Sequence, residues 1–180
     1  STTASAVNNG SSDACGIQSL TLSQTAFTCA NIATNPNTVT LTVTDVNSNV
    51  NTCTATVTVQ DTVLPVALCQ PVTVQLDNTG NGSTTASAVN NGSSDACGIQ
   101  TLSLSQTAFT CANVGSNTVT LTVTDVNSNV NTCTATVTVQ DTVLPVALCQ
   151  PVTVQLDNTG NGSTTASAVN NGSSDACGIQ

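Results

Sequence analysis

The chain has 180 residues, contains no Lys, Arg or His, and carries a net charge of −9 that comes entirely from aspartates. A chain without cationic side chains cannot neutralise phosphates, which excludes nucleic acids and acidic membrane surfaces as partners. Because Glu and Tyr are also missing, the usual general bases and oxyanion-stabilising cations are absent, and we expect no enzyme activity. No apolar run approaches the ~20 residues of a membrane-spanning helix, so no direct membrane insertion is expected.

The sequence repeats itself almost letter for letter. Residues 1–18 return unchanged at 83–100 and at 163–180, so the period is 82 residues and then 80. A period of this size suits one small β domain per copy. We therefore expect the C-terminal part of one repeat (1–60), a complete repeat (61–140) and the N-terminal part of the next (141–180). The chain is then a window from a longer tandem array.

Alternating apolar and polar residues predict short strands throughout the complete repeat, and no helical stretch is expected. In chain order the strands are one holding Val72, Val74 and Leu76, a weaker alanine-lined one at 84–89, one at Leu102 and Leu104, and three at 109–114, 118–124 and 134–139. Turn formers rich in Asn and Gly separate them. This pattern predicts an all-β fold of tandem immunoglobulin-like β-sandwiches, reinforced by disulfides.

The nine cysteines are distributed as four per complete repeat. Two bridges in about 80 residues indicate an oxidising, extracellular setting, either secreted or at the cell surface. We favour Cys69–Cys133 and Cys97–Cys111, although four cysteines allow three pairings and the other two stay open. The same choice gives Cys15–Cys29 in the first copy. Partners outside the chain are expected for three cysteines: Cys53, Cys149 and Cys177.

The residues of the complete repeat resemble a known family. The stretch 61–74 (DTVLPVALCQPVTV) resembles the opening of a hyalin-repeat (HYR-type) domain, and Asp95-Ala-Cys-Gly98 resembles that family's Asp-Asn-Cys-Gly loop. Residues 118–125 and 132–139 resemble its closing hairpin. The resemblance implies immunoglobulin-like modules strung in tandem in secreted or surface proteins, most like those of Bacteroidetes-type bacteria. Cys111 is extra beside the family's simplest pattern, which supports pairing it with Cys97.

Two kinds of glycosylation site are candidates. Thr62 and Thr142 each lie in Asp-Thr-Val, which resembles the O-glycosylation signal of those bacteria, at the expected junctions between repeats. Asn-Gly-Ser matches the N-glycan acceptor pattern, but an ordinary turn is the favoured interpretation of these sites. The five asparagines concerned are Asn9, Asn81, Asn91, Asn161 and Asn171.

Calcium is the one candidate cofactor. Oxygen-bearing side chains recur at alternate positions in 77–82 and 125–129, as they do in Ca²⁺ loops. The candidate ligands are Asp77, Asp125, Asn127 and Asn129, with Asp61 or Asp141 as extra ligands. Neither loop has the bidentate Glu of a strong site, and Asp and Asn also build turns without metal.

These observations favour a structural function. We expect a rigid, protease-resistant spacer in an extracellular stalk or fibril of the surface-adhesin type, whose partners are neighbouring repeats and covalent glycans. The alternative is a module that binds glycan, ice or another surface through its Thr-rich strand faces and Asp loops. Threonine is also a common solvent-facing strand residue, which is the simpler explanation of those faces.

Overall fold

The computed structural model describes residues 1–179, and the chain divides into two compact units. The first unit comprises Ser1–Leu64 together with Ala96–Gly98. The second comprises Pro65–Asp95 and the chain from Ile99 onward. The division therefore falls after residue 64, whereas the sequence repeat begins at residue 61. Strands make up most of the regular structure in both units, as the sequence predicts.

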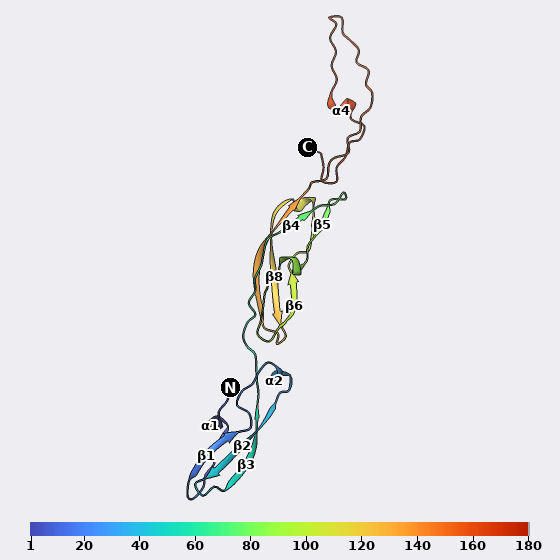
Figure 1. Cartoon of the computed structure of the whole chain (residues 1–180). Coiled ribbons are helices and arrows are strands. Elements are labelled where there is room, and N and C mark those ends of the chain that lie inside the picture. The colour runs from blue at the N-terminus through green and yellow to red at the C-terminus, as the bar shows by residue number, and fades with distance from the viewer. Residues whose placement is uncertain (180) are drawn as a thin grey trace. The chain divides into compact units, whose positions relative to one another are not determined.

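The first unit is built on one antiparallel sheet in the order β1-β2-β3 (Figure 1). Its strands are β1 (Ile17–Leu22), β2 (Asn37–Asp45) and β3 (Val50–Val57). Two single-turn helices accompany the sheet, α1 (Ala4–Val7) and α2 (Ala30–Ala33). The central strand β2 buries Val39 and Leu41, because it has a neighbour on each side.

The second unit has a four-stranded sheet in the order β4-β9-β8-β6 and a small two-stranded sheet, β5-β7 (Figure 1). The large sheet consists of β4 (Val72–Gln75), β6 (Ile99–Leu104), β8 (Gly115–Asp125) and β9 (Val130–Gln140). The small sheet pairs β5 (Asn81–Ser83) with β7 (Ala108–Thr110), which a 3₁₀ turn, η1 (Cys111–Asn113), follows. Among the strands formed by the described residues of this unit, the β4–β9 pairing is parallel and the others are antiparallel.

One apolar core joins the two sheets of the second unit. Phe109, the side chain that β7 contributes, is buried among residues of the large sheet, as expected for alternating strands whose apolar faces meet. In β5, a Cβ on Gly82 would lie 2.6 Å from Val74 Cγ1, so only a glycine lets this strand approach β4. The buried core residues are Val74, Leu76, Val89, Phe109, Val119, Leu121, Val123, Ala135, Val137 and Val139.

The expectation of no helix is wrong, because four single helical turns form. The stretch 84–89 is not a strand: α3 (Ala86–Val89) forms there, and α4 (Ala166–Val169) forms at the same place one repeat later. In both, the preceding threonine accepts a hydrogen bond from a backbone N–H of the helix, at 3.2 Å in each case. Three of the four turns have the sequence Ala-Ser-Ala-Val, in which alanine favours helix and the threonine caps it.

The disulfides differ from the favoured pairing in two of three bonds. The structure contains Cys69–Cys133, but it also joins Cys29 to Cys97 and Cys111 to Cys177. The favoured pairs Cys97–Cys111 and Cys15–Cys29 are not formed, and Cys177 has its partner inside the chain. Three cysteines form no disulfide here and are exposed: Cys15, Cys53 and Cys149.

The strands explain why Cys97 does not reach Cys111. Within the large sheet β6 runs in the same direction as β4, the turn at Asp77–Asn81 reverses the chain into β5, and β7 is antiparallel to β5, so β7 continues in the direction of β6. The six residues of β6 and the three residues of β7 therefore both carry the chain away from Cys97, by about 20 Å and about 10 Å. A disulfide requires Cα atoms within about 7 Å of each other. A loop of this shape therefore leaves Cys97 and Cys111 too far apart to bond.

Candidate functional site

The three disulfides close a series of overlapping loops. Cys29–Cys97, Cys69–Cys133 and Cys111–Cys177 span 68, 64 and 66 residues. The first loop ends after the second begins, and the second ends after the third begins. Every peptide bond between Cys29 and Cys177 therefore lies inside at least one disulfide loop, and no single backbone cut in that stretch separates the chain.

The outer two bridges connect successive copies of the repeat. Cys29 and Cys111 occupy the same position in consecutive copies, as do Cys97 and Cys177. In both bonds a cysteine of one copy is joined to a cysteine of the copy that follows it. The Cys69–Cys133 bond, by contrast, lies within the complete copy. Nine cysteines leave three unbonded under the favoured pairing and under the observed one alike, so their number carried no signal for this arrangement.

Local hydrogen bonds position Cys177, the cysteine that bonds to Cys111 of the preceding copy. In the third copy the Asp175 carboxylate accepts a 2.7 Å hydrogen bond from the backbone N–H of Cys177, and Asp13 does the same for Cys15 at 2.8 Å. On the partner side, Gly80 lies against Cys111: a Cβ at Gly80 would be 2.5 Å from Cys111 Sγ and 3.4 Å from Ala176 Cβ. The turn at Gly80 has a φ of +75°, so a side chain there would be disfavoured by backbone and space together.

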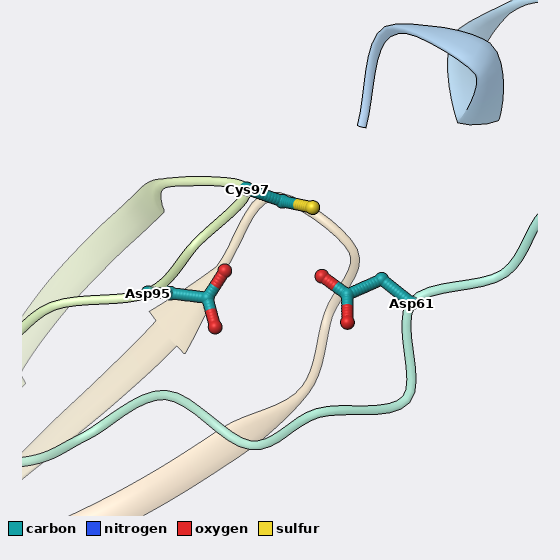
Figure 2. Close-up of side chains that lie close together, drawn as sticks. All are labelled: Asp61, Asp95 and Cys97. Carbon is teal, nitrogen blue, oxygen red and sulfur yellow. The ribbon is translucent and has the colours of Figure 1, made fainter. Parts of the chain in front are cut away.

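Acidic side chains gather beside the bridging cysteine. Asp141, Asp175 and Cys177 each place one oxygen or sulfur atom within 4.8 Å of the others. Figure 2 shows the residues at the same positions one repeat earlier, with the side chains of Asp61 and Cys97 of the first unit and that of Asp95. Both sulfurs are committed to disulfides and are not thiolates that could ligate a metal. Two carboxylates, those of Asp141 and Asp175, remain in the group of the second unit.

The candidate calcium loops are closed by their own hydrogen bonds. Asp125 is fully buried and accepts 2.8 Å hydrogen bonds from the backbone N–H groups of Asn127 and Asn129 and from the Asn129 side-chain amide. Burial opposes ionisation of Asp125, but these hydrogen bonds outweigh it and lower the pKa of the carboxyl. Oδ1 of Asn127 accepts no hydrogen bond.

The exposed loop at Asp77 has the same character. Its carboxylate accepts a hydrogen bond from the Thr79 hydroxyl at 2.6 Å and others from the backbone N–H groups of Asn81 and Thr79, in that order of effect, and they lower the pKa of Asp77. The Thr79 and Asn81 donors thus point at the carboxylate oxygen of Asp77 to which a cation would bind. Calcium at either loop stays a prediction from the sequence.

The candidate O-glycosylation sites are accessible. Thr62 and Thr142 are both exposed, and each follows an aspartate whose carboxylate accepts a 3.0 Å hydrogen bond from the backbone N–H two residues on. The Thr142 hydroxyl donates to the side chain of Gln75 at 3.2 Å. These short turns hold the hydroxyls on the surface, where a transferase could reach them.

Three of the Asn-Gly-Ser positions, at Asn9, Asn91 and Asn171, lie in exposed turns, whereas Asn81-Gly82-Ser83 forms strand β5. At Gly10, Gly92 and Gly172 the backbone takes a φ of about +80°, as the turn interpretation requires. The Asn81 side chain donates to the Thr79 hydroxyl and the Asn161 side chain to the Thr159 hydroxyl. The five asparagines at these positions are all exposed: Asn9, Asn81, Asn91, Asn161 and Asn171.

The outer face of the large sheet is a lattice of hydroxyls, which we call the threonine face. Threonines stand opposite one another across β8 and β9, as Thr118↔Thr136, Thr120↔Thr134 and Thr122↔Thr132. Thr73 of β4 and Thr101 of β6 extend the lattice to the two edges. The side chains between them point into the core, so the face is polar because the strands alternate.

In comparisons with known proteins, no family model matches the chain, and no curated protein matches it either. Within residues 1–179 no helix has the length and apolar character needed to cross a membrane.

Proposed function

We propose that each copy of the repeat is an immunoglobulin-like β-sandwich of the hyalin-repeat type. Support comes from the complete copy, where a four-stranded and a two-stranded sheet share one core. The Cys69–Cys133 bond joins the segment just before β4 to strand β9. Strands β4 and β9 are neighbours in the large sheet. Domains of this size bury little apolar surface and depend on such bonds.

We further propose that the chain is a structural segment of an extracellular stalk or fibril. The overlapping disulfide loops carry this proposal. A stalk works by keeping its two ends connected under pull and proteolysis, and these loops provide two covalent paths across the complete copy. Bonds of this kind persist in oxidising, extracellular surroundings. The lack of Lys and Arg removes every trypsin site as well.

Limited cleavage tests this function. An Asp-specific protease, used until each chain is cut about once, should leave the protein at 17.9 kDa on a non-reducing gel and release fragments after reduction. Cleavage at Asp13, which lies outside every loop, is the internal control and should release a short peptide without reduction. Fragments that separate without reduction after cuts between residues 29 and 177 would contradict the proposal.

A second candidate function rests on the threonine face. Its regular cross-strand register presents hydroxyls in rows that could bind ice or polysaccharide, or carry glycans. The test is binding of the purified chain to ice and to a panel of polysaccharides, with Thr120→Val and Thr134→Val as the matched change. Binding that these substitutions abolish would favour this candidate over the spacer; absence of binding would remove it.

A further inference from the structure

We propose that Asn91 is a site of spontaneous deamidation, where the backbone nitrogen of Gly92 attacks the side chain and water completes the conversion to isoaspartate. The inference goes beyond the proposed function and does not depend on it. It is carried by two identical tripeptides of the complete copy that lie in different backbone structures, Asn91-Gly92-Ser93 and Asn81-Gly82-Ser83.

The turn at Asn91 leaves both reacting groups free. Gly92 has a φ of +79°, and among the described residues only its chain neighbours lie within 4 Å of the place that a Cβ would take. Within residues 1–179 no hydrogen bond holds the Asn91 side chain or the Gly92 N–H. Asn91 is also exposed to water. The side-chain carbon of Asn91 can therefore approach the nitrogen of Gly92, which no Cβ shields.

The second tripeptide is held in strand β5. Its Asn81 side-chain amide donates to the Thr79 hydroxyl at 2.9 Å and to the Thr79 carbonyl at 3.2 Å. Gly82 lies opposite Phe109 in the β5–β7 ladder, and a Cβ there would be 2.6 Å from Val74 Cγ1. Asn81 is exposed as well, so access to water does not distinguish the two sites. The ring that deamidation requires can close at Asn81 only after β5 has opened.

The next copy repeats the open turn. Asn171 is exposed there, and Gly172 has a φ of +80°. Asn91 lies in a copy whose strands are all present, and Asn171 follows that copy in the chain. Neither setting covers the turn, so the exposure of its asparagine is a property of the turn itself.

The reaction needs only water and hydroxide from the solvent. Hydroxide removes the N–H proton of Gly92, and the nitrogen attacks Cγ of Asn91. The new C–N bond closes a cyclic imide, and the side-chain nitrogen takes a proton from water and leaves as ammonia. Water then cleaves a ring C–N bond: cleavage at the main-chain carbonyl gives isoaspartate, and cleavage at Cγ gives aspartate. One water is consumed and one ammonia is released, and no atom is oxidised or reduced.

Isoaspartate at this position loosens the segment that leads to β4. The Asn91 N–H donates to the Leu68 carbonyl at 2.9 Å, and the Ser93 hydroxyl accepts a hydrogen bond from the Leu68 N–H at 2.9 Å. The next residue, Cys69, forms a β-bridge with Asn90. Because isoaspartate runs the main chain through Cγ, it adds one carbon between Asn90 and Ser93. These contacts cannot all keep their spacing in the longer turn, so the segment around Leu68 opens more often.

The experiment ages the full, oxidised 180-residue chain for weeks in mildly alkaline buffer. After reduction, a protease that cuts before aspartate releases residues 77–94, which contain both tripeptides, and fragmentation in the mass spectrometer locates isoaspartate. Residues 157–174 have the same sequence, so the exposed change Ser163→Thr is introduced to give that peptide a different mass. Isoaspartate should form at Asn91 at least about tenfold faster than at Asn81, which corresponds to an opening free energy of about 1.4 kcal/mol for β5.

The same chain, reduced and unfolded in urea, is the matched control. Both tripeptides should react there at similar rates, because β5 no longer protects Asn81. Asn91→Gln should remove the fast site of the folded chain and leave the rate at Asn81 unchanged. The inference is overturned if Asn81 reacts as fast as Asn91 in the folded chain, if Asn91 forms no isoaspartate, or if the difference persists in urea.

Hydrogen exchange measured by NMR tests the structural consequence. The Leu68 N–H should exchange faster in aged chains that contain isoaspartate. Asn91→Asp adds the same charge without the extra carbon and should leave the exchange of Leu68 unchanged. Equal exchange in fresh and aged chains, or faster exchange in Asn91→Asp alone, would contradict the loosening.

Discussion

Strands β3 and β9 share one sequence and differ in burial. In β9, Val137 is fully buried and Ala135 is 9% exposed, whereas Val57 and Ala55 of β3 are only half-buried. The difference follows from β4, which pairs with β9 but has no counterpart on β3. Alternation along a strand thus decides which side chains can be buried, and the neighbouring strand decides whether they are.

The central strands of the same two sheets are alike. Leu41 in β2 and Leu121 in β8 are exposed by 1% and 0%, because each strand has neighbours on both sides. The comparison therefore separates two contributions within identical sequences. The pairs that β2 makes with β1 and β3 recur between β8 and its neighbours, and two further pairs, Gly115↔Val139 and Ser116↔Thr138, lengthen the β8–β9 ladder in the complete copy.

The largest expected effect comes from the bond that anchors β4. Replacing Cys69 and Cys133 together by alanine should lower the free energy of unfolding of the second unit by about 4 kcal/mol, because the loop they close is long. Replacing Cys149, the unbonded counterpart of Cys69, should leave it unchanged. Denaturant unfolding followed by circular dichroism measures both. Equal losses from the two changes would break the comparison.

A matched pair of leucines tests the core directly. Leu76 is 4% exposed, and its counterpart Leu156 is 68% exposed. Leu76→Ala should lower the free energy of unfolding by about 2–3 kcal/mol, since it opens a cavity in the core of the second unit. Leu156→Ala should change it by less than about 0.5 kcal/mol. A comparable loss from Leu156→Ala would show that the third copy is already covered.

A smaller effect is expected at the helical turns. Thr85 caps α3, and its removal in Thr85→Ala should destabilise the second unit by about 0.5–1 kcal/mol. Thr3→Ala removes the same cap from α1 in the first unit. Because α1 contains no buried residue, this substitution should have less effect on unfolding. Thermal unfolding of the two variants side by side checks the difference. A larger loss in Thr3→Ala would contradict it.

Acid titration should show no difference between copies. Hydrogen bonds from the Thr79 and Thr159 hydroxyls, together with nearby backbone N–H groups, lower the pKa of Asp77 and of Asp157. A lowered pKa means that the stabilisation is fully present above the unfolded value of about 3.9 and is lost as the pH falls through the folded value. Carboxyl chemical shifts measured against pH should move below the ordinary Asp range for both. An ordinary pKa at Asp157 alone would show that the loop needs its partner strands.

Much of the sheet could be predicted from alternation alone. The expected strands 118–124 and 134–139 lie inside β8 and β9, because threonines and apolar residues alternate there without interruption. The expected strand at 84–89 was wrong for a local reason. Its alanines favour a helix, and Thr85 caps that helix. The pairing of cysteines between successive copies was the harder problem. Spacing favoured Cys97–Cys111, and only the lengths and directions of β6 and β7 show that these cysteines end far apart.

The candidate sites also differ in whether they depend on local or on distant residues. Exposure of Thr62 and of the Asn-Gly turns follows from local turn chemistry and was predictable. The bridge between successive copies depends on where two distant loops meet, which no local pattern encodes. Gly80 gives a hint after the fact, since the close approach of Cys111 and Ala176 requires a glycine in that turn.

Disulfide mapping of the oxidised chain tests the central claim most directly. After digestion without reduction, mass spectrometry should find Cys29 linked to Cys97, Cys69 to Cys133 and Cys111 to Cys177, so that the first and the third bond run from one copy to the next. A peptide pair linking Cys97 to Cys111 would contradict the account, because each copy would then be closed on itself and the overlapping loops would not exist.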